Sequence, residues 1–450
     1  MLPRLRTGTA GTRPAGFRSE PDARGAYRTH ICWETLVMEI RNEPRGTAIS
    51  FRQLKLFESV GRLRNLRRGS EECNLSQPAV TQALCKLEQQ LGSRLLDRRA
   101  SGSYLTAEGQ IMHRRVTRMF SMFEEAVREL DVREEAEAAQ AVVNRLSRSQ
   151  IRSLISVIDQ GSFKAAASAL GISEAALKRA ARDLESNLQT QIYFRTADGL
   201  MVTQAGVRFG RRIRLALQEI DWGLSEIGDP DGKADGKIVI GALPFGGNML
   251  IASVLEGFLA RHPSVDLQIT SCGASEMMRR LREGDVDLVI GLIQETSADD
   301  FSHQMLIETP YKIAARRHHP LTRLQAVGLE TLAHFDWVVG DEGSNRRACF
   351  DMLFAGHDKP ATPIATSATN VIRHLLCGSD RLTLMTSYEL SHHGQALVSV
   401  PFAALSPAPA LGITSRAGWM PTQLHEDFIA LLRSHAMLST FSSTDGGCLQ

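Results

Sequence analysis

The stretch GSFKAAASALGISEAALKRAARDLE, residues 161–185, decides the fold of the first half of the chain. Ser162 can cap a short helix whose run of alanines lets another helix approach closely. Gly171 suits the left-handed turn that ends a helix, and Ser173 can cap a second helix over 174–186. Two helices joined by so short a turn form a helix-turn-helix, whose second helix can enter the major groove of DNA.

A second copy of this stretch lies 97 residues earlier in the chain. Residues 53–109 align without a gap with residues 150–206, and 14 of the 57 aligned positions are identical. In the earlier copy the second helix starts at Ser76, with Pro78 in its first turn, where proline is tolerated. Such self-similarity indicates two copies of one module. The identical pairs include Ser76 and Ser173, Leu87 and Leu184, Glu88 and Glu185, Arg98 and Arg195, Gly102 and Gly199, Thr106 and Thr203, and Gly109 and Gly206.

Each copy continues into a segment that carries arginine beside a glycine turn. The segments are RLLDRRASGSYLT (residues 94–106) and QIYFRTADGLMVT (residues 191–203). In each, two short strands flank a glycine, and this pattern predicts a hairpin, the wing of a winged helix. The side chains expected beside the wings, where they suit phosphate, are Arg98, Arg99 and Arg195.

A long helix is expected after each wing. Apolar residues recur there at spacings of four and three, which is typical of a coiled-coil seam and equally of the core-facing side of an amphipathic helix. Because DNA-binding winged helices usually work as dimers, we expect at least one of the two helices to pair. The seam residues are Met112, Val116, Met119, Phe123, Ala126 and Leu130 in the first helix, and Ile213, Leu217, Ile220, Leu224 and Ile227 in the second.

The net charge of +2 conceals a gradient along the chain. Residues 49–130 hold 14 basic and 9 acidic residues, residues 150–228 hold 10 and 8, and residues 236–437 hold 16 and 20. The basic end suits the phosphates of DNA, although differences of this size also arise by chance.

Several other classes of protein are disfavoured. No stretch reaches 18 apolar residues, and the first 48 residues lack the apolar run of a secretory signal. Seven dispersed cysteines without a CxxC pair predict reduced thiols in the cytoplasm. The segment GALPFGGN lacks the Lys-Ser/Thr of a P-loop, no GxSxG motif is present, and His318, His319, His392 and His393 are expected to be exposed loop residues. We therefore expect no metal, no cofactor and no catalysis.

The second half of the chain has the pattern of an α/β domain. Residues 228–236, GDPDGKADG, are polar and rich in Gly and Asp, which indicates a linker. Beyond it, buried-strand runs such as KIVIGAL and VDLVIGL alternate with helices, which predicts a sheet covered on both faces. Asn248 is expected to cap the helix after the first strand. Ligands of such sheets bind at the carboxyl ends of strands, beside helix N-termini.

Hydroxyl groups and free backbone N–H groups at several helix starts would suit an anionic ligand. Taken singly, each such residue is better explained as a plain helix cap, and only their recurrence at successive strand ends favours a binding site. The candidate ligand-binding residues are Pro244, Phe245, Gly246, Asn248, Ser275, Ser344, Asn345, Ser367, Thr369 and Asn370.

The motifs, in this order, resemble those of the LysR-type transcriptional regulators. FRQLKLFESV (residues 51–60) and the segment from NLSQPAVTQAL to LTAEG (residues 74–109) resemble the family's N-terminal DNA-binding domain, and residues 161–206 resemble it again. Residues 236–437 resemble the family's effector domain through LREGDVDLVIGL, ARRHHPL and LGITSRAGWMPTQLHEDFIALLRSH. The family normally has one winged helix per chain, so two tandem copies are a departure.

The resemblance implies a multidomain chain. Two all-α winged helix-turn-helix modules with long linker helices would precede an α/β effector domain of two subdomains, like those of periplasmic binding proteins (type II), with a ligand in the cleft between them. Met38 precedes the first motif by a family-like distance, so translation could start there. The expected boundaries are a disordered extension (1–48), first winged helix (49–110), linker helix (111–148), second winged helix (149–206), linker helix and hinge (207–235), effector domain (236–437, with the first subdomain at 236–293 and 418–437 and the second at 294–417) and tail (438–450).

The two second helices offer different side chains to DNA. The earlier helix has glutamines, which suit adenine edges, whereas the later one has basic residues beside Glu174, which phosphate would repel unless the carboxylate accepts from cytosine. We expect the first copy to supply most base readout and the second to add phosphate contacts or only structure. Gly69 in the first copy costs ~1 kcal/mol against alanine. The candidate DNA-binding residues are Ser76, Gln77, Pro78, Thr81, Gln82, Lys86, Arg98, Arg99, Ser173, Lys178, Arg179, Arg182 and Arg195.

The sequence thus predicts a DNA-binding transcriptional regulator controlled by a small-molecule effector, an organic acid or an aromatic compound. Expected partners are double-stranded DNA, the effector, further copies of the chain (homodimer or homotetramer) and RNA polymerase. The alternative is a ligand-sensing protein that has lost DNA binding and acts through protein contacts. For an enzyme built on the effector fold, the sequence offers no nucleophile or metal site.

Overall fold

The computed structural model describes residues 49–444, except for residues 100, 131–135, 197–198, 228–235, 245, 294–299, 395 and 404. The expected N-terminal extension lies outside the described residues, as do nearly all of the expected linker, the last six residues and Phe245.

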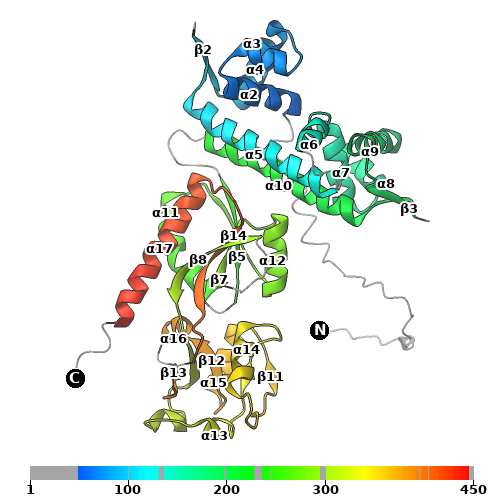
Figure 1. The fold of residues 1–450 in the computed structure, drawn as a ribbon. Coiled ribbons are helices and arrows are strands. Elements are labelled where there is room, and N and C mark those ends of the chain that lie inside the picture. Colours follow the sequence, from blue (N-terminus) through cyan, green and yellow to red (C-terminus); the bar gives the residue numbers. More distant parts are fainter. Residues whose placement is uncertain are drawn as a thin grey trace, which may run out of the picture. The chain divides into compact units, whose positions relative to one another are not determined.

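The first winged helix forms as expected (Figure 1). Pro78 lies in the first turn of α4, and Ser76 occupies its N-cap position without a side-chain hydrogen bond to the helix. The wing pairs Leu96 with Leu105 and Arg99 with Gly102. Its elements are α2 (Phe51–Leu63), α3 (Leu66–Glu72), α4 (Gln77–Leu91), β1 (Leu96–Arg99) and β2 (Gly102–Leu105).

The second winged helix repeats this order of elements. The Ser162 and Ser173 side chains cap α8 and α9 by accepting from the backbone N–H groups of Ala165 and Ala176, and Gly171 ends α8 with a left-handed φ of 66°. The helix caps predicted for this copy are therefore confirmed. Its elements are α7 (Arg148–Gln160), α8 (Phe163–Leu170), α9 (Glu174–Leu188), β3 (Tyr193–Thr196) and β4 (Gly199–Val202).

The repeated residues explain why the two modules fold alike. Glu88 accepts hydrogen bonds from the backbone of Leu95 and Leu96, and Glu185 does the same for the equivalent residues of the second copy. A Cβ on Gly109 would lie 2.0 Å from the carbonyl oxygen of Leu95, and one on the equivalent Gly206 would meet the same obstacle at 2.7 Å. The residues that are identical in the two copies thus hold each wing against the helix before it and the helix after it.

A 24-residue helix follows each wing: α5 (Ala107–Leu130) and α10 (Gln204–Ile227). The expected single linker helix over 111–148 is wrong, because α5 ends at Leu130 and a separate short helix, α6 (Ala136–Val143), packs beside it. The two long helices lie side by side and form one hydrophobic core with both winged helices (Figure 1).

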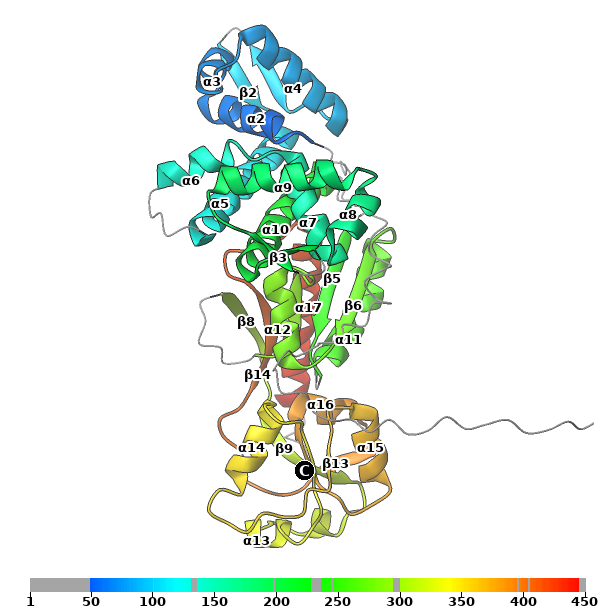
Figure 2. The same ribbon diagram turned by 90° about the vertical axis from the view of Figure 1, so that its right-hand side faces the viewer.

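The first effector subdomain is a five-stranded sheet in the order β6-β5-β7-β14-β8. The strands β5, β6 and β7 are parallel, and β14 is antiparallel to both of its neighbours. The helices α11 and α17 pack together against the sheet, and α12 packs against β7 and β14 (Figure 2). Its elements are β5 (Lys237–Ala242), α11 (Gly247–Arg261), β6 (Asp266–Ser271), α12 (Ala274–Glu283), β7 (Leu288–Leu292), β8 (Phe301–Glu308), β14 (Ala410–Arg416) and α17 (Gln423–Thr444).

The expected subdomain boundaries at 294 and 417 are wrong. The strands β8 and β14 were assigned to the second subdomain, yet β14 pairs with both β7 and β8 and so places the two strands in the first sheet. The expected tail from residue 438 also starts too early, because α17 continues to Thr444. Among the described residues, no helix is both long and apolar enough to cross a membrane.

The second subdomain holds β9 between β12 and β13, and a parallel pair of β10 and β11. The backbone N–H of Val338 donates to Leu382 and the Thr383 hydroxyl donates to Val338, which joins β10 to the strand β12. Its elements are β9 (Tyr311–Arg316), a 3-10 turn (Pro320–Arg323), α13 (Leu329–Leu332), β10 (Val338–Val339), α14 (Asn345–Leu353), β11 (Ile364–Ala365), α15 (Thr369–Cys377), β12 (Thr383–Thr386), α16 (Ser387–His392) and β13 (Leu397–Ser399).

Candidate functional site

The helix α4 turns its polar side to solvent. Val80, Leu84 and Leu87 are buried in the module, whereas Gln77 and Gln82 are exposed. The other predicted side chains of α4 and its cap are Ser76, Pro78 and Lys86, which are exposed, and Thr81, which is half-buried. The structure therefore brings the predicted base-reading side chains together on one accessible face.

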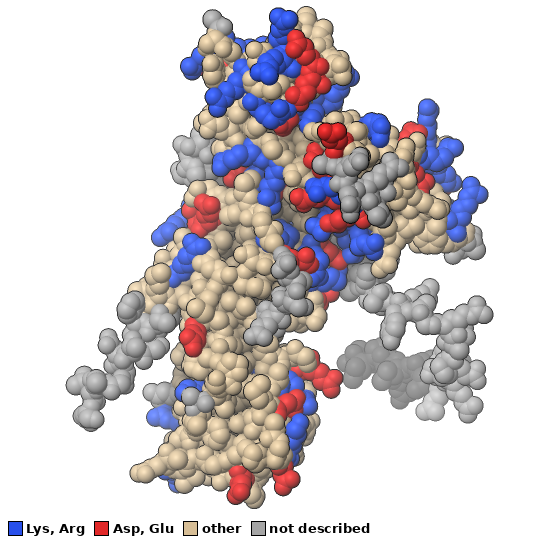
Figure 3. All heavy atoms as spheres, in the orientation of Figure 1, with Lys and Arg blue, Asp and Glu red and all other residues tan. Residues whose placement is uncertain are grey.

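The wing adds positive charge beside this helix. Arg98 and Arg99 are both exposed; Arg98 reaches Cys85 of α4 at 3.6 Å, and Arg99 pairs with Asp97 at 2.8 Å. Figure 3 shows Lys and Arg side chains gathered over this module and again at the end of the second winged helix. A long, flexible guanidinium at the wing is well suited to a phosphate.

The helix α9 presents a more highly charged face. Ser173, Lys178, Arg179 and Arg182 are exposed, as is Arg195 on its wing. Lys178 Nζ lies 3.0 Å from the carboxylate of Glu174, one turn earlier. The negative charge of Glu174, which phosphate would repel, is thus neutralised within the helix. Lys178 is then less available to bind phosphate.

The predicted effector residues lie at strand ends in both subdomains. Ser344 caps α14 by accepting from the Arg347 N–H. The predicted cap at Asn248 is wrong, because α11 already begins at Gly247 and Asn248 lies in its first turn. The others lie where helices begin: Pro244 and Gly246 before α11, Ser275 in α12, Asn345 in α14, and Thr369 and Asn370 in α15.

The loop after β5 reaches the second subdomain. A Cβ on Gly246 would lie 3.5 Å from Leu411 and 3.7 Å from the ring of Tyr388 in α16. Gly246 itself has a φ of 109°, a conformation that side chains rarely adopt. One part of the predicted site therefore lies where the two subdomains meet.

Family models match most of the chain. The model "LysR substrate binding domain" matches residues 231–437. The model "Bacterial regulatory helix-turn-helix protein, lysR family" matches twice, at residues 51–110 and 149–207. The chain belongs to the LysR family. It is a transcriptional regulator with a ligand-binding domain, and the second match confirms that it carries two helix-turn-helix modules in tandem.

Similar proteins include other regulators. The HTH-type transcriptional regulator GalR of Pseudomonas putida is 27% identical over 386 residues, which cover 85% of this chain and 96% of GalR. The regulator GbpR of Rhizobium radiobacter is 24% identical over 52% of this chain and 79% of its own length. A full-length OxyR variant from Pseudomonas aeruginosa has 19% identity and a TM-score of 0.47, over 64% of this chain and 94% of its own.

One buried ion pair of this LysR-family regulator was missed from the sequence. Arg346, in the first turn of α14, donates to the carboxylate of Glu389 in α16 at 2.8 Å, and both side chains are at most 2% exposed. The Glu389 carboxylate also accepts from the backbone of Thr386, which closes a capping box. A clue was available, since Arg346 lies four residues before the buried Phe350 on one helix face.

A second buried cluster connects the linker helices to the effector domain. The guanidinium of Arg115 in α5 donates to Glu219 (2.9 Å) and Glu226 (2.8 Å) of α10, and to the carbonyl oxygens of Met420 and Pro421. Burial lowers the pKa of Arg115, but its hydrogen bonds to the two glutamates outweigh burial and raise it overall. The arginine therefore stays charged, although its side chain is only 2% exposed.

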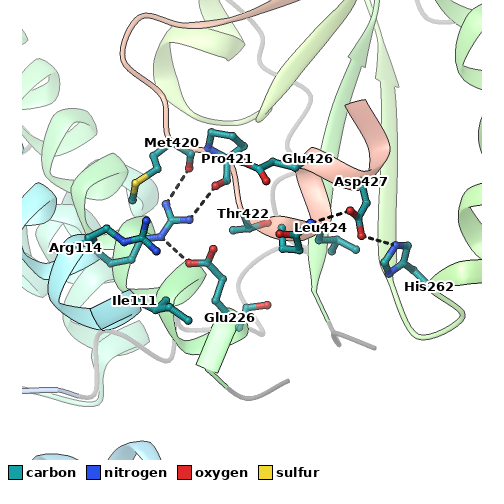
Figure 4. A pocket seen from close by; sticks show the side chains of 13 residues that line it. Ile111, Arg114, Glu226, His262, Met420, Pro421, Thr422, Leu424, Glu426 and Asp427 are labelled. Atoms are coloured by element: carbon teal, nitrogen blue, oxygen red, sulfur yellow. Dashed lines mark hydrogen bonds and ion pairs between the residues drawn. The ribbon is translucent and has the colours of Figure 1, made fainter. Parts of the chain in front are cut away.

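A cavity of about 420 Å³ lies beside this cluster. Figure 4 shows Glu226 of α10 facing the Met420–Pro421 turn, with the α17 residue Asp427 paired to His262 on the far side. None of the predicted effector-binding residues lines this cavity. Its lining is instead shared by α5, α10, His262 and the start of α17, which makes it part of the connection between the linker helices and the effector domain.

Two of the four histidines predicted to be exposed, His319 and His393, are not. His319 is fully buried, where its Nδ1 accepts from the backbone of Leu321 and its Nε2 contacts the carbonyl oxygen of Asp380 at 3.1 Å. His319 closes a turn rather than facing solvent, and His393 is half-buried. His318 is exposed as predicted, whereas His392 is exposed but ends the helix α16. Burial also raises the pKa of the Cys349 thiol to about 11, which keeps this cysteine protonated at neutral pH.

Proposed function

We propose that the first winged helix of this regulator reads DNA sequence and that the second adds contacts to phosphate. The observation that carries the proposal is the accessible polar face of α4, where Gln77 and Gln82 stand beside Lys86 and the wing residue Arg98. Glutamine pairs with adenine edges in the major groove, and arginine beside the groove favours phosphate. The exposed Arg179 on α9 supports the second role.

A salt titration tests both roles. The full-length protein is bound to a duplex that it selects itself from a random-sequence pool, and the affinity is measured at several salt concentrations. Arg98→Ala and Arg179→Ala should each weaken binding and reduce the slope of log affinity against log salt by about 0.9. The exposed effector-domain variant Lys359→Ala is the matched control. An unchanged slope for Arg179→Ala would show that the second module does not contact DNA. If the protein selects no duplex, a ligand sensor that has lost DNA binding would be favoured.

We also propose that the effector is an anionic organic acid or aromatic compound, held between the subdomains. Support comes from the predicted residues at the carboxyl ends of β5, β6, β10 and β11, where helices begin and leave backbone N–H groups for an anion. Gly246, close to Tyr388, contributes from the junction of the two subdomains. Phe245 belongs to the proposed site but lies outside the described residues.

Thermal stability in the presence of aliphatic and aromatic carboxylates tests the effector site. A bound carboxylate should raise the unfolding temperature, and Ser344→Ala and Asn370→Ala should reduce that rise. The exposed His318→Ala variant is the control. If both variants keep the full effect of a carboxylate that stabilises the wild type, the ligand binds elsewhere.

Regulation would then follow from a shift between two states of the regulator. A ligand changes such a balance only through its different affinity for the two states. Arg115 holds the Met420–Pro421 turn to both linker helices, so a movement of this turn would reach α5 and α10 directly.

We further propose that chains assemble as homodimers or homotetramers, and that the regulator acts on DNA in the cytoplasm and contacts RNA polymerase. Leu259 on α11 and Ile269 on the edge strand β6 are both 43% exposed, which supports pairing through the effector domain. Light scattering of Ile269→Asp should give a smaller assembly than the wild type. An unchanged mass would place the contact elsewhere.

A further inference from the structure

The two linker helices of one chain run in opposite directions along each other. Glu129, at the end of α5, pairs with Arg212 near the start of α10 at 2.8 Å. At the other end of the pair, a Cβ on Gly223 would lie 3.3 Å from Met112 Cε. Late positions of α5 thus meet early positions of α10, and the helices overlap along most of their length (Figure 1).

The contacts have the symmetry of a homodimer although they lie in one chain. Arg115 Nε lies 2.8 Å from Glu226, and Arg212 Nη2 lies 2.8 Å from Glu129. Arg212 and Glu226 stand 97 positions after Arg115 and Glu129, which is the offset of the repeat. In a two-fold interface residue i contacts j, and j contacts i. The α5–α10 contact is therefore an interface between equivalent modules, joined within one polypeptide.

The apolar seams that were predicted to pair are buried in this contact between α5 and α10. A linker helix from another chain could reach them only if α5 and α10 separated, which would also expose the buried charges of Arg115 and Glu219. The seam residues buried in the common core are Met112, Val116, Met119, Phe123, Ala126, Ile213, Leu217, Ile220 and Ile227, with Leu130 and Leu224 packed at its margin.

Helix length fixes how far apart the two modules are attached. Each linker helix has 24 residues and begins directly after its own wing. At ~1.5 Å per residue this corresponds to about 36 Å. Because the helices are antiparallel, the wings join at opposite ends of the pair. Half-sites bound by paired helix-turn-helix modules are centred about 34–36 Å apart, one turn of DNA.

We propose that a single chain is a complete two-headed DNA-binding unit, which engages two half-sites about one helical turn apart. The proposal rests on the proposed function, in that both modules contact DNA. The two half-sites are not contacted alike, because the residues at equivalent positions of the two recognition helices differ. The equivalent pairs are Gln77 and Glu174, Thr81 and Lys178, Gln82 and Arg179, and Lys86 and Asp183.

Hydroxyl-radical footprinting of the full-length protein on its selected duplex tests this arrangement. Gln82→Ala and Arg179→Ala change the same position of the two copies, so they form a matched pair, with Lys359→Ala as the control. The wild type should protect two segments about one turn apart. Gln82→Ala should weaken one segment and Arg179→Ala the other. If chains assemble further, the effects should fall on alternate segments.

A conventional dimer of two chains gives the opposite pattern. Each chain would then place its α4 helix in one half-site, so Gln82→Ala would weaken both segments equally and Arg179→Ala would leave both intact. That result would overturn the two-headed unit while leaving DNA binding by the first module in place. A protein that protects no selected duplex would overturn the DNA-binding proposal as well.

Discussion

Each winged helix packs against its own linker helix at an equivalent pair of positions. In one copy the glycine lies on the winged helix and the large residue on the linker helix, and in the other copy the two are exchanged. In the first copy, a Cβ on Gly61 would lie 2.5 Å from the ring of His113 in α5. In the second, the large residue is Ile158 on the first helix, and a Cβ on Gly210 in α10 would lie 2.3 Å from it. Both pairs are related by the 97-residue offset. Packing has thus been preserved by compensating changes, while the DNA-facing residues have diverged.

The largest effect is expected at the buried arginine of the helix pair. Arg115→Leu removes one partner of the buried Glu219 and should cost about 3–5 kcal/mol of unfolding free energy. The equivalent pair of Arg212 and Glu129 is about half exposed, so Arg212→Leu should cost less than about 1 kcal/mol. Urea unfolding followed by tryptophan fluorescence compares the two, since Trp222 lies beside Arg115. Equal losses would contradict the asymmetry of the two equivalent ion pairs.

Exchanging the glycine and the large residue at positions 61 and 113 should show that their effects on the free energy of unfolding are coupled. Gly61→Ile alone overpacks the contact with His113 and should cost about 1–3 kcal/mol. Adding His113→Gly reproduces the arrangement of the second copy and should recover part of that loss, beyond additivity by at least 0.5 kcal/mol. The same denaturation assay measures Gly61→Ile, His113→Gly and the double variant. Strictly additive losses would mean that the two positions are not one conserved contact.

A glycine in α3 should behave against its helix propensity. Alanine at Gly69 would gain about 1 kcal/mol from propensity. However, its Cβ would lie 2.6 Å from Cγ2 and 3.3 Å from Cα of Val60, so the gain should be cancelled or reversed. Ala166→Gly at the equivalent position of the second copy should cost about 1 kcal/mol. A stabilised Gly69→Ala protein would show that α3 and α2 can move apart at little cost.

The smallest effect is expected from exchanging the first residues of the two recognition helices. Glu174→Gln removes a carboxylate and releases Lys178, so DNA affinity should rise a few-fold and the salt slope should steepen by about 0.9. Gln77→Glu should lower affinity. Titration of the selected duplex measures both variants. An affinity that falls in Glu174→Gln would instead indicate that Glu174 accepts a hydrogen bond from DNA.

The sequence predicted the local elements well, because their signals are local. Ser162, Gly171 and Ser173 define the ends of their helices by hydrogen bonds to residues nearby in the chain. The strands β8 and β14 were misassigned because their pairing with each other and with β7 is set by contacts distant in sequence. The predicted cap at Asn248 failed for a different reason, since Gly246 occupies the N-cap position two residues earlier.

The pairing of α5 with α10 was only half predicted. The apolar spacing indicated two seams, but spacing cannot tell a partner in the same chain from one in another. In the structure, two ion pairs show that the partner lies in the same chain. They join Arg115 to Glu226 and Arg212 to Glu129, which are related by the 97-residue offset. The burial of Arg346 was only hinted at by its spacing from Phe350, and its pairing with Glu389 was not predicted, because charged residues on short helices normally face solvent.

A stoichiometric titration shows whether one chain fills both half-sites. The full-length Ile269→Asp protein, first shown by light scattering to be a single chain, is added to a duplex carrying both protected segments. Concentrations lie far above the dissociation constant, and bound DNA is followed by fluorescence anisotropy. The two-headed unit predicts saturation at one chain per duplex. Saturation at two chains per duplex would show that different chains fill the paired half-sites, and that a single chain is not a two-headed unit.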